Sequence, residues 1–316
     1  MVLMILFLVI GFVLLVKGAD LFVDGACDLS AKLRIPAYIV GLTVVAFGTS
    51  LPEAAVSITA SLQGSNEIAI GNIIGSNIFN TLVVLGASAL FAPVAVKGNI
   101  LKRDFPFCIG ITAVMIVLLM TLNHGDIALT RLDGIILLAL FAVFMVGSVV
   151  MGKKESKLIE SAEDSEKADL PMWKCLLFII IGFVGVVVGG QLTVKGAKEL
   201  ALMAGMSERV VGLTVVAIGT SLPELVTSIV AARKQQNDIA VGNVIGSNIF
   251  TLLFILGISA TIGTIGTDFN VVIDGCVLIG ICLFTYIFAL ANKKINRPCG
   301  VVMIFMYVAY TVYLLV

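Results

Sequence analysis

Residues 41–86 read GLTVVAFGTSLPEAAVSITASLQGSNEIAIGNIIGSNIFNTLVVLG. Residues 212–257 read GLTVVAIGTSLPELVTSIVAARKQQNDIAVGNVIGSNIFTLLFILG. The two copies align without a gap at an offset of 171 residues, and 29 of the 46 aligned positions are identical. Each copy places GTSLPE and then GNxIGSNIF inside apolar sequence. A charged residue inside a bilayer is costly and marks a candidate functional site, so the duplicated glutamate indicates one site built from both copies.

The composition is that of a membrane protein. Hydrophobic residues make up 59% of the 316 residues, charged residues 13%, and the mean hydropathy is +1.14. Soluble domains are about half apolar and about a quarter charged. The chain therefore predicts an all-α polytopic protein whose surroundings are the lipid bilayer. Its formal net charge of zero and its lack of a basic face argue against nucleic acid as a partner.

Apolar runs separated by polar breaks predict ten transmembrane helices, at about 20 residues for each span. The N-terminal apolar run is interpreted as a membrane helix and not as a removed signal, because it lacks a basic start and a small-residue cleavage site. The ten spans are expected near residues 2–30, 36–63, 67–92, 105–122, 128–151, 172–203, 208–232, 238–264, 271–290 and 299–316.

Lysine and arginine gather in the linkers that follow spans one, three, five, seven and nine. The opposite linkers hold only Arg131, Lys198 and Arg209. Basic residues stay in the cytoplasm, so we expect a multi-pass protein of the plasma (inner) membrane with both termini extracytoplasmic. An odd number of spans in each repeat then places the second copy upside down. We expect two inverted five-helix repeats, 1–151 and 172–316, joined by a cytoplasmic linker, 152–171.

The GTSLPE segment predicts a broken helix. Pro52 lacks an N–H and clashes with the carbonyl four residues earlier, so we expect the carbonyls near Ala46 to lose helical partners. Irregular backbone at membrane depth is tolerated only inside protein or along a water-filled cavity. The second copy has the same sequence around Pro223, so we expect a second helix break there. Together the two segments offer two glutamates, four hydroxyls and several carbonyls.

This ligand set contains only oxygen atoms, without accompanying histidine, cysteine or methionine. Such sets favour hard cations, and a dehydrated cage with two carboxylates suits Ca²⁺, while the same oxygens suit Na⁺. A purely structural kink with paired acids is the alternative. The six cysteines show no metal or redox spacing and are interpreted as small apolar residues.

The second motif supplies further polar groups. Ser76 and Asn80 share one helical face, as do Ser247 and Thr251. The remaining asparagines are interpreted mainly as helix-packing groups that tie the broken backbone, with direct ligation as the alternative. These four residues are Asn72, Asn77, Asn243 and Asn248.

The paired motifs resemble the α-repeats of the sodium/calcium exchanger family, in its compact prokaryotic form. The resemblance implies that Glu53 and Glu224 are the shared Ca²⁺ and Na⁺ carboxylates. It also implies ligation by Thr49, Thr220 and the carbonyls of Ala46 and Ala217, flanking Na⁺ sites made by Ser50 with Ser247 and by Ser221 with Ser76, and a polar role for Asn80. The second repeat commonly has an aspartate where this chain has Thr251.

We expect a secondary antiporter, not an enzyme, that exchanges Ca²⁺ for Na⁺ by alternating access, without a cofactor or an obligate protein partner and as a monomer. The family implies that the first and sixth spans slide against the rest. An H⁺/Ca²⁺ exchanger using the same glutamates is the alternative within this class, and a cation channel is the alternative outside it. Asp20, Asp24 and Asp28 share one face of the first span and are interpreted as a charged strip, packed near the helix end or against Lys195. A cation vestibule is the other interpretation of that strip.

Overall fold

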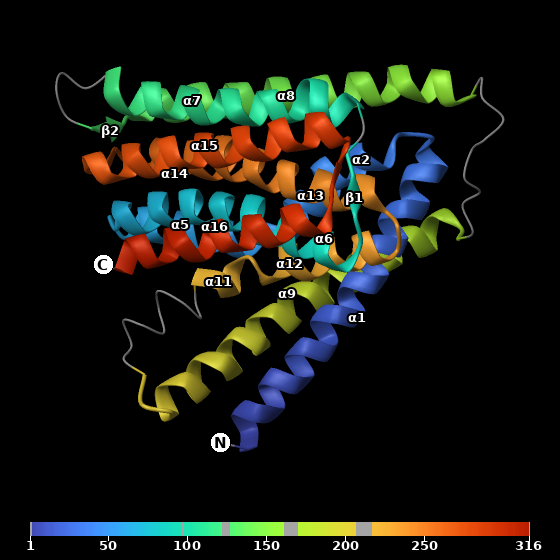
Figure 1. The fold of residues 1–316 in the computed structure, drawn as a ribbon, viewed down its shortest axis with the longest axis horizontal. Coiled ribbons are helices and arrows are strands. Elements are labelled where there is room, and N and C mark those ends of the chain that lie inside the picture. The colour runs from blue at the N-terminus through green and yellow to red at the C-terminus, as the bar shows by residue number, and fades with distance from the viewer. Residues whose placement is uncertain (1, 97, 122–126, 161–169, 207–216, 316) are drawn as a thin grey trace.

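A computed structural model describes residues 2–96, 98–121, 127–160, 170–206 and 217–315 of the chain. These residues form a bundle of long helices with two short two-stranded sheets (Figure 1). Most helices run nearly side by side, from α7 and α8 at one face to α12 at the other. The pair α1 and α9 crosses that face obliquely, as Figure 1 shows.

The two sequence repeats give matching series of elements, in which π-helical turns carry the label η. The first series is α1 (Val2–Leu33), α2 (Ala37–Val40), η1 (Gly41–Val45), α3 (Ala46–Thr49), α4 (Leu51–Leu62), α5 (Asn66–Phe79), η2 (Asn80–Val84), α6 (Leu85–Phe91), β1 (Val94–Ala95), η3 (Ile100–Asp104), α7 (Phe105–Thr121), β2 (Ala128–Leu129) and α8 (Arg131–Glu160). The second series is α9 (Met172–Met203), α11 (Ala217–Thr220), α12 (Leu222–Arg233), α13 (Asn237–Ile249), η5 (Phe250–Ile255), α14 (Leu256–Ile262), β3 (Ile265–Gly266), α15 (Phe269–Asn292), β4 (Lys294–Ile295) and α16 (Arg297–Leu315).

The described residues contain eight helical segments that are long and apolar enough to cross a membrane, and one bent pair of helices that forms a ninth. The bent pair joins Ala37–Thr49 to Leu51–Leu62. All nine segments overlap predicted spans. The predicted span 208–232 falls partly on residues 207–216, outside the described residues. The all-helical membrane fold is therefore confirmed, with eight candidate spans among the described residues, and nine when the bent pair is counted as one span.

The predicted helix break is present at Ser50, where the helix bends by 51°. Ser50 has φ −85° and ψ 7°, and Ser221 has nearly the same backbone angles between α11 and α12. One part of the prediction is wrong: the Ala46 carbonyl keeps a helical partner, since it accepts a hydrogen bond of 3.1 Å from the Ser50 backbone N–H. The reason is that Pro52 removes its own N–H, which would have bonded to the Gly48 carbonyl, two residues after Ala46.

The strands mark the two ends of the bundle. β1 pairs antiparallel with β4, and β2 pairs antiparallel with β3. The β1 strand lies at one end of the bundle, whereas β2 and the C terminus lie at the other (Figure 1). β1 and β3 occupy matching positions in the two sequence repeats, at the offset of 171 residues. Matching segments therefore lie at opposite ends of the molecule.

The helix α8 differs from its predicted extent. It continues past Met151 to Glu160, so the first part of the predicted linker 152–171 is helical. The sequence KKESKLIE explains this continuation, because lysine, glutamate and leucine are strong helix formers and need no core to extend an existing helix. The middle of the predicted linker, 161–169, lies outside the described residues.

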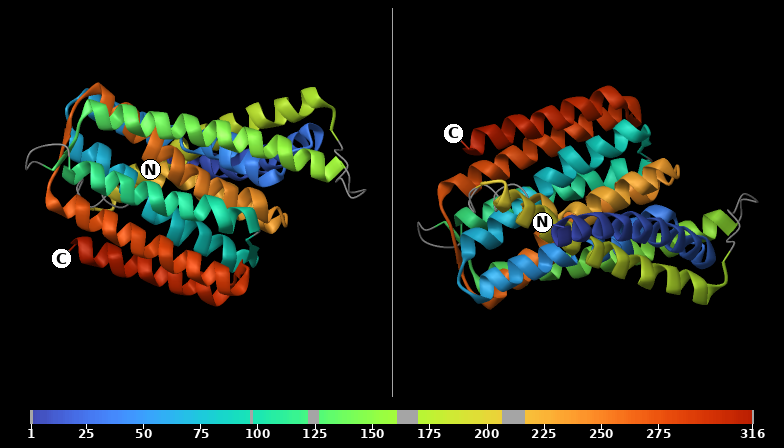
Figure 2. Two further views of the ribbon diagram at one scale, coloured as in Figure 1. Left: turned by 90° about the horizontal axis from the view of Figure 1, so that it is seen from above. Right: turned by 90° about the horizontal axis from the view of Figure 1, so that it is seen from below.

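Helices α1 and α9 lie side by side in antiparallel orientation over most of their length (Figure 2). Glycines that recur every seven residues bring the two backbones into close contact. A Cβ on Gly18 would lie 2.6 Å from the backbone nitrogen of Val186, and one on Gly25 would lie 2.9 Å from the Cys175 carbonyl. Small residues permit such close packing inside membranes. The same spacing on both helices therefore makes α1 and α9 one tightly packed unit.

We expect Gly18→Val to separate α1 from α9, because its Cβ would meet Val186 and Gly182 backbone atoms at 2.6–2.8 Å. Overpacking of this kind costs about 1–3 kcal/mol. Thermal unfolding of the purified protein in detergent measures the loss. Gly147→Val in α8 is the matched control, since a Cβ there meets nothing within 4 Å. Equal melting temperatures for the two variants would contradict the close packing of this helix pair.

Candidate cation site

The two glutamates of the repeats lie at equivalent positions in the core. Glu53 is in the first turn of α4 and Glu224 is in the first turn of α12, and both side chains are fully buried. The helix breaks at Ser50 and Ser221 create these new helix N-termini, where the backbone dipole favours negative charge. Each glutamate contacts the serine at the other helix break, so the two acids lie in the same part of the core. The breaks thus bring two acids together at helix starts.

Each glutamate is held by a serine from the other half of the chain. Ser221 donates a hydrogen bond of 2.8 Å to Glu53 Oε1, and Ser50 donates one of 2.9 Å to Glu224 Oε1. These reciprocal bonds connect residues far apart in sequence. They give each carboxylate one fixed oxygen and leave the other available.

Several buried polar atoms of this region have no hydrogen-bond partner among the described residues. They include the second carboxylate oxygens, Glu53 Oε2 and Glu224 Oε2, both amide atoms of Asn80, and Ser247 Oγ. All four side chains are at most 1% exposed. Buried polar groups are normally satisfied, and each exception requires an explanation such as an ion. This set of oxygen atoms is chemically suited to a hard cation.

Two asparagines connect the glutamate helices to their neighbours. Asn243 Nδ2 donates to Ser228 Oγ at 2.9 Å and to the Glu224 carbonyl at 3.4 Å, while its Oδ1 accepts from Thr49 Oγ1 at 3.0 Å. The repeat counterpart Asn72 makes the equivalent donations, to the hydroxyl of Ser57 and the carbonyl of Glu53. These contacts agree with the interpretation of the two asparagines as helix-packing groups, and they connect each asparagine to the backbone at its glutamate.

The second pair of asparagines connects the two halves at the start of η2 and η5. Asn77 Nδ2 donates to Thr251 Oγ1 at 2.6 Å, and Asn248 Nδ2 donates to Thr81 Oγ1 at 2.9 Å. Thr251 Oγ1 in turn donates to the Asn248 carbonyl at 3.0 Å. The Thr251 hydroxyl is therefore engaged in packing. Asn80, at the equivalent position of the first repeat, keeps both polar atoms without a hydrogen bond in the described part of the chain.

For the remaining predicted residues, the structure gives local contacts and positions in the helices. Ser76 Oγ donates to the Ile73 carbonyl at 3.0 Å, which leaves its lone pairs available. Thr220 ends α11 and precedes the break, and Ala217 begins that helix. The Ala46 carbonyl also lies 3.4 Å from Thr49 Oγ1. Within the described ranges, no group of three histidine, cysteine, aspartate or glutamate side chains gathers into a metal centre, which agrees with a set of two acids and neutral oxygens.

Sequence reasoning missed two serines of this region, Ser57 and Ser228. Both are fully buried, and each accepts a hydrogen bond from the asparagine that supports its glutamate. A signal for them was available, because the two serines are identical and equivalent in the repeat alignment, one helical turn after each glutamate. A serine within a helix is common, so the sequence does not single these two out. Only their hydrogen bonds with Asn72 and Asn243 show that they help to position the glutamate helices.

A buried pair of carboxylates at the helix breaks of a polytopic bundle is the arrangement expected of a membrane transporter of cations. The comparisons agree. The sequence profile of the sodium/calcium exchanger protein family matches residues 3–150 and 174–316. The chain is 32% identical over 341 residues to the sodium/calcium exchanger MaX1 of Methanosarcina acetivorans, covering 98% of this chain and 97% of that protein. It is 40% identical over 260 residues to the inner membrane protein YrbG of Escherichia coli (strain K12), covering 81% and 78%.

The fold agrees with solved structures of the sodium-calcium exchanger NCX_Mj. One of them, soaked without Na⁺ and Ca²⁺, has a TM-score of 0.85 and 34% sequence identity and covers 98% of both chains. The chain belongs to the sodium/calcium exchanger family. It is therefore a membrane antiporter and not an enzyme, as the sequence predicted.

We expect Asn243→Leu to destabilise the protein, because it removes the three hydrogen bonds that Asn243 makes to Glu224, Ser228 and Thr49. Leaving a buried polar partner unsatisfied costs about 1–3 kcal/mol. The thermal unfolding temperature in detergent should fall. The control is Asn292→Leu, since Asn292 is exposed at the end of α15. An Asn243→Leu protein as stable as this control would show that the asparagine does not support the glutamate helix.

Proposed function

We propose that the chain exchanges Ca²⁺ for Na⁺ across the membrane by alternating access at one central site formed by Glu53 and Glu224. The observation that carries the proposal is the pair of fully buried carboxylates, each with one oxygen held by a serine and one without a partner in the described structure. Membership in the sodium/calcium exchanger family supports the choice of ions.

Different atoms of the site suit different ligand roles. Glu53 Oε2 and Glu224 Oε2 provide the charged oxygens, and Asn80 Oδ1 provides a neutral one. Thr49, Thr220 and the carbonyls of Ala46 and Ala217 remain candidate ligands next to them. For the flanking Na⁺ sites we retain Ser50 with Ser247 and Ser221 with Ser76. We assign Thr251 to packing, because its hydroxyl is engaged with Asn77 and Asn248.

Charge balance provides the physical reason for exchange. Two buried carboxylates carry about the charge that one Ca²⁺ or two Na⁺ neutralise, whereas the ion-free site would leave both acids uncompensated in a low-dielectric core. The ion-free protein should therefore switch between its two access states slowly. Flux in one direction then requires an ion for the return step, which is the behaviour of an antiporter.

We also propose the inverted architecture expected from the sequence, with two five-helix halves, 1–151 and 172–316, joined through 152–171. Supporting it, β1 and β3 have equivalent places in the repeats but lie at opposite ends of the bundle (Figure 1). The concentration of basic residues in alternate linkers places both termini outside the cytoplasm. The site lies within one chain, so we expect the monomer to be the transporting unit.

We expect Glu53→Gln and Glu224→Gln each to abolish Na⁺-dependent Ca²⁺ exchange, because either change removes one of the two charges that balance the ion. The measurement is ⁴⁵Ca²⁺ uptake into Na⁺-loaded proteoliposomes, with Na⁺-free vesicles as a reference. Glu67→Gln is the matched control, since Glu67 is exposed in the first turn of α5. Normal exchange in both site variants would exclude the assigned site.

The same vesicles separate the rival mechanisms. Uptake driven by a pH gradient without internal Na⁺ would identify an H⁺/Ca²⁺ exchanger. Uptake that needs no counter-ion would identify a channel.

We expect Asn80 and Thr251 to respond differently to substitution, although they occupy equivalent positions in the repeats. Asn80→Ala should raise the Ca²⁺ concentration for half-maximal exchange about ten-fold or more, because a contact with a charged partner is worth about 1.5–3 kcal/mol. Thr251→Val should leave this concentration nearly unchanged and lower the thermal stability. Equal shifts in apparent affinity for the two variants would contradict the unequal roles.

A further inference from the structure

The two helices that carry the glutamates, α4 and α12, differ in how far neighbouring helices cover them. In α4, Val56 and Thr59 are exposed, and Val56 is 36% accessible. Their repeat counterparts in α12, Thr227 and Val230, are buried, at 0% and 7%. The two helices are identical at six of their twelve positions and begin at the same break. The difference therefore comes from the neighbouring helices.

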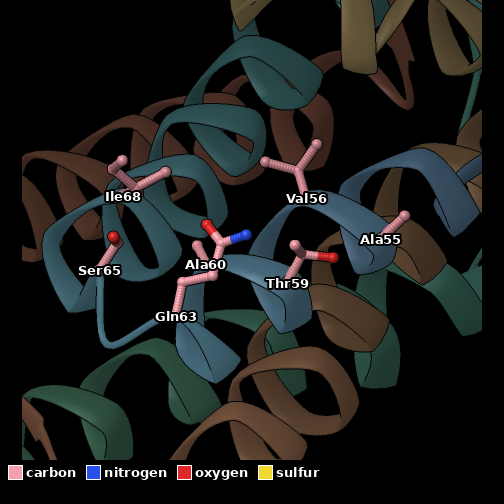
Figure 3. Close-up of a pocket in the computed structure, with 7 residues that line it drawn as sticks. All are labelled: Ala55, Val56, Thr59, Ala60, Gln63, Ser65 and Ile68. Atoms are coloured by element: carbon pink, nitrogen blue, oxygen red, sulfur yellow. The ribbon is translucent and has the colours of Figure 1, made fainter.

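The neighbour that covers α12 is α1. Helix α1 packs along α12, whereas α9, its repeat counterpart, contacts α3, α11 and α12 and makes no comparable contact with α4 among the described residues. Beside α4 lies an open hollow of about 400 Å³, lined by Ala55, Val56, Thr59, Gln63 and Ile68 (Figure 3). The face of α12 that carries Thr227 and Val230 is thus covered by α1, and the equivalent face of α4 is uncovered, although both glutamates are buried.

An ion-pair cluster lies where α1 covers the end of α12. Lys234 Nζ is 2.7 Å from Asp24 Oδ1, 3.4 Å from Asp20 Oδ1 and 3.1 Å from the Asp20 carbonyl. Lys234 caps α12, and Gln235 follows it with φ 61°, so a tight turn fixes the lysine. The expectation that these aspartates pack against Lys195 is wrong, because Lys195 lies over the Phe7 ring, 5.2 Å from its centroid.

The equivalent positions of the other repeat lack these opposite charges. The repeat counterparts of Asp20, Asp24 and Lys234 are Gln191, Lys195 and Gln63. Two glutamines and one lysine carry no opposite charges, so α9 could not form an equivalent ion pair if it covered α4. The ion pair can therefore form when α1 covers α12, but it has no equivalent in an arrangement in which α9 covers α4.

We propose that Lys234, Asp20 and Asp24 form a latch that stabilises one access state, with α1 closed over α12 and α4 uncovered. This inference rests on the proposed alternating access, in which the α1–α9 unit moves relative to the core. Moving α1 along α12 would separate Lys234 from at least one aspartate, since Asp20 and Asp24 lie one helical turn apart. The latch therefore raises the population of this state without touching the bound ions.

The size of the effect follows from the exposure of the three side chains, which is 30% for Lys234, 38% for Asp20 and 49% for Asp24. Exposed ion pairs contribute modestly and are screened by salt. We expect loss of the latch to change the ratio of the two access states by about two- to five-fold at low ionic strength.

Thiol labelling tests the latch without depending on ion transport. Thr59→Cys reports access along α4 and Val230→Cys reports access along α12, in a protein whose six native cysteines are replaced. Their rates of reaction with a small maleimide are compared in detergent at low salt, where both ends of the protein are accessible. Lys234→Gln and Asp24→Asn should each raise the Val230→Cys rate relative to the Thr59→Cys rate by about two- to five-fold. Exchanging the charges, with Lys234→Asp and Asp24→Lys together, should restore the original ratio.

Asp28→Asn is the matched control, since Asp28 lies on the same face of α1, one turn beyond Asp24, and has no ion pair in the described structure. An unchanged ratio in both Lys234→Gln and Asp24→Asn would overturn the latch, and so would an equal change in Asp28→Asn. A protein that fails to exchange ions but shows the expected ratios would refute the proposed function and retain the latch.

Discussion

The burial of two carboxylates in an apolar bundle is the constraint on which the rest of the structure depends. Charges at membrane depth are costly unless they are paired, hydrogen-bonded or bound to an ion. Here the helix breaks place Glu53 and Glu224 at helix N-termini, and serines from opposite halves bind one oxygen of each. The asparagines on α5 and α13 then support the backbone at each glutamate. The second oxygen of each carboxylate has no hydrogen-bond partner among the described residues. This fits a site that a transported cation occupies.

The two sequence repeats have different roles where their neighbouring helices differ. Thr251 is used in packing, whereas Asn80 keeps both polar atoms free of described partners, so the cation environment is unequal on its two sides. Helix α1 covers α12, while α4 borders an open hollow. Two halves of identical sequence would populate the two access states equally, so an inequality of this kind allows one state to be favoured. The ion pair of Lys234 is a local source of this preference.

Much of the fold and of the site could be predicted from the sequence. The apolar composition and the spacing of polar breaks indicated the spans, because a bilayer requires about 20 apolar residues for each helix. Pro52 and Pro223 indicated the breaks, since proline cannot continue a helix hydrogen-bond ladder. The duplicated motifs marked both glutamates. The partner of Asp20 and Asp24 could not be predicted, because any of several lysines could reach them and the choice depends on how α1 lies across α12.

The sequence by itself determined the class of this protein, its helices and the chemical type of its site, because these follow from local composition and from residues repeated in order along the chain. Only the tertiary structure decided which oxygens are engaged and which are free, which serine binds which glutamate, and which side of the core α1 covers. The physical reason is that hydrogen bonds and ion pairs between the halves join residues more than 160 positions apart. Their partners are selected by packing in space.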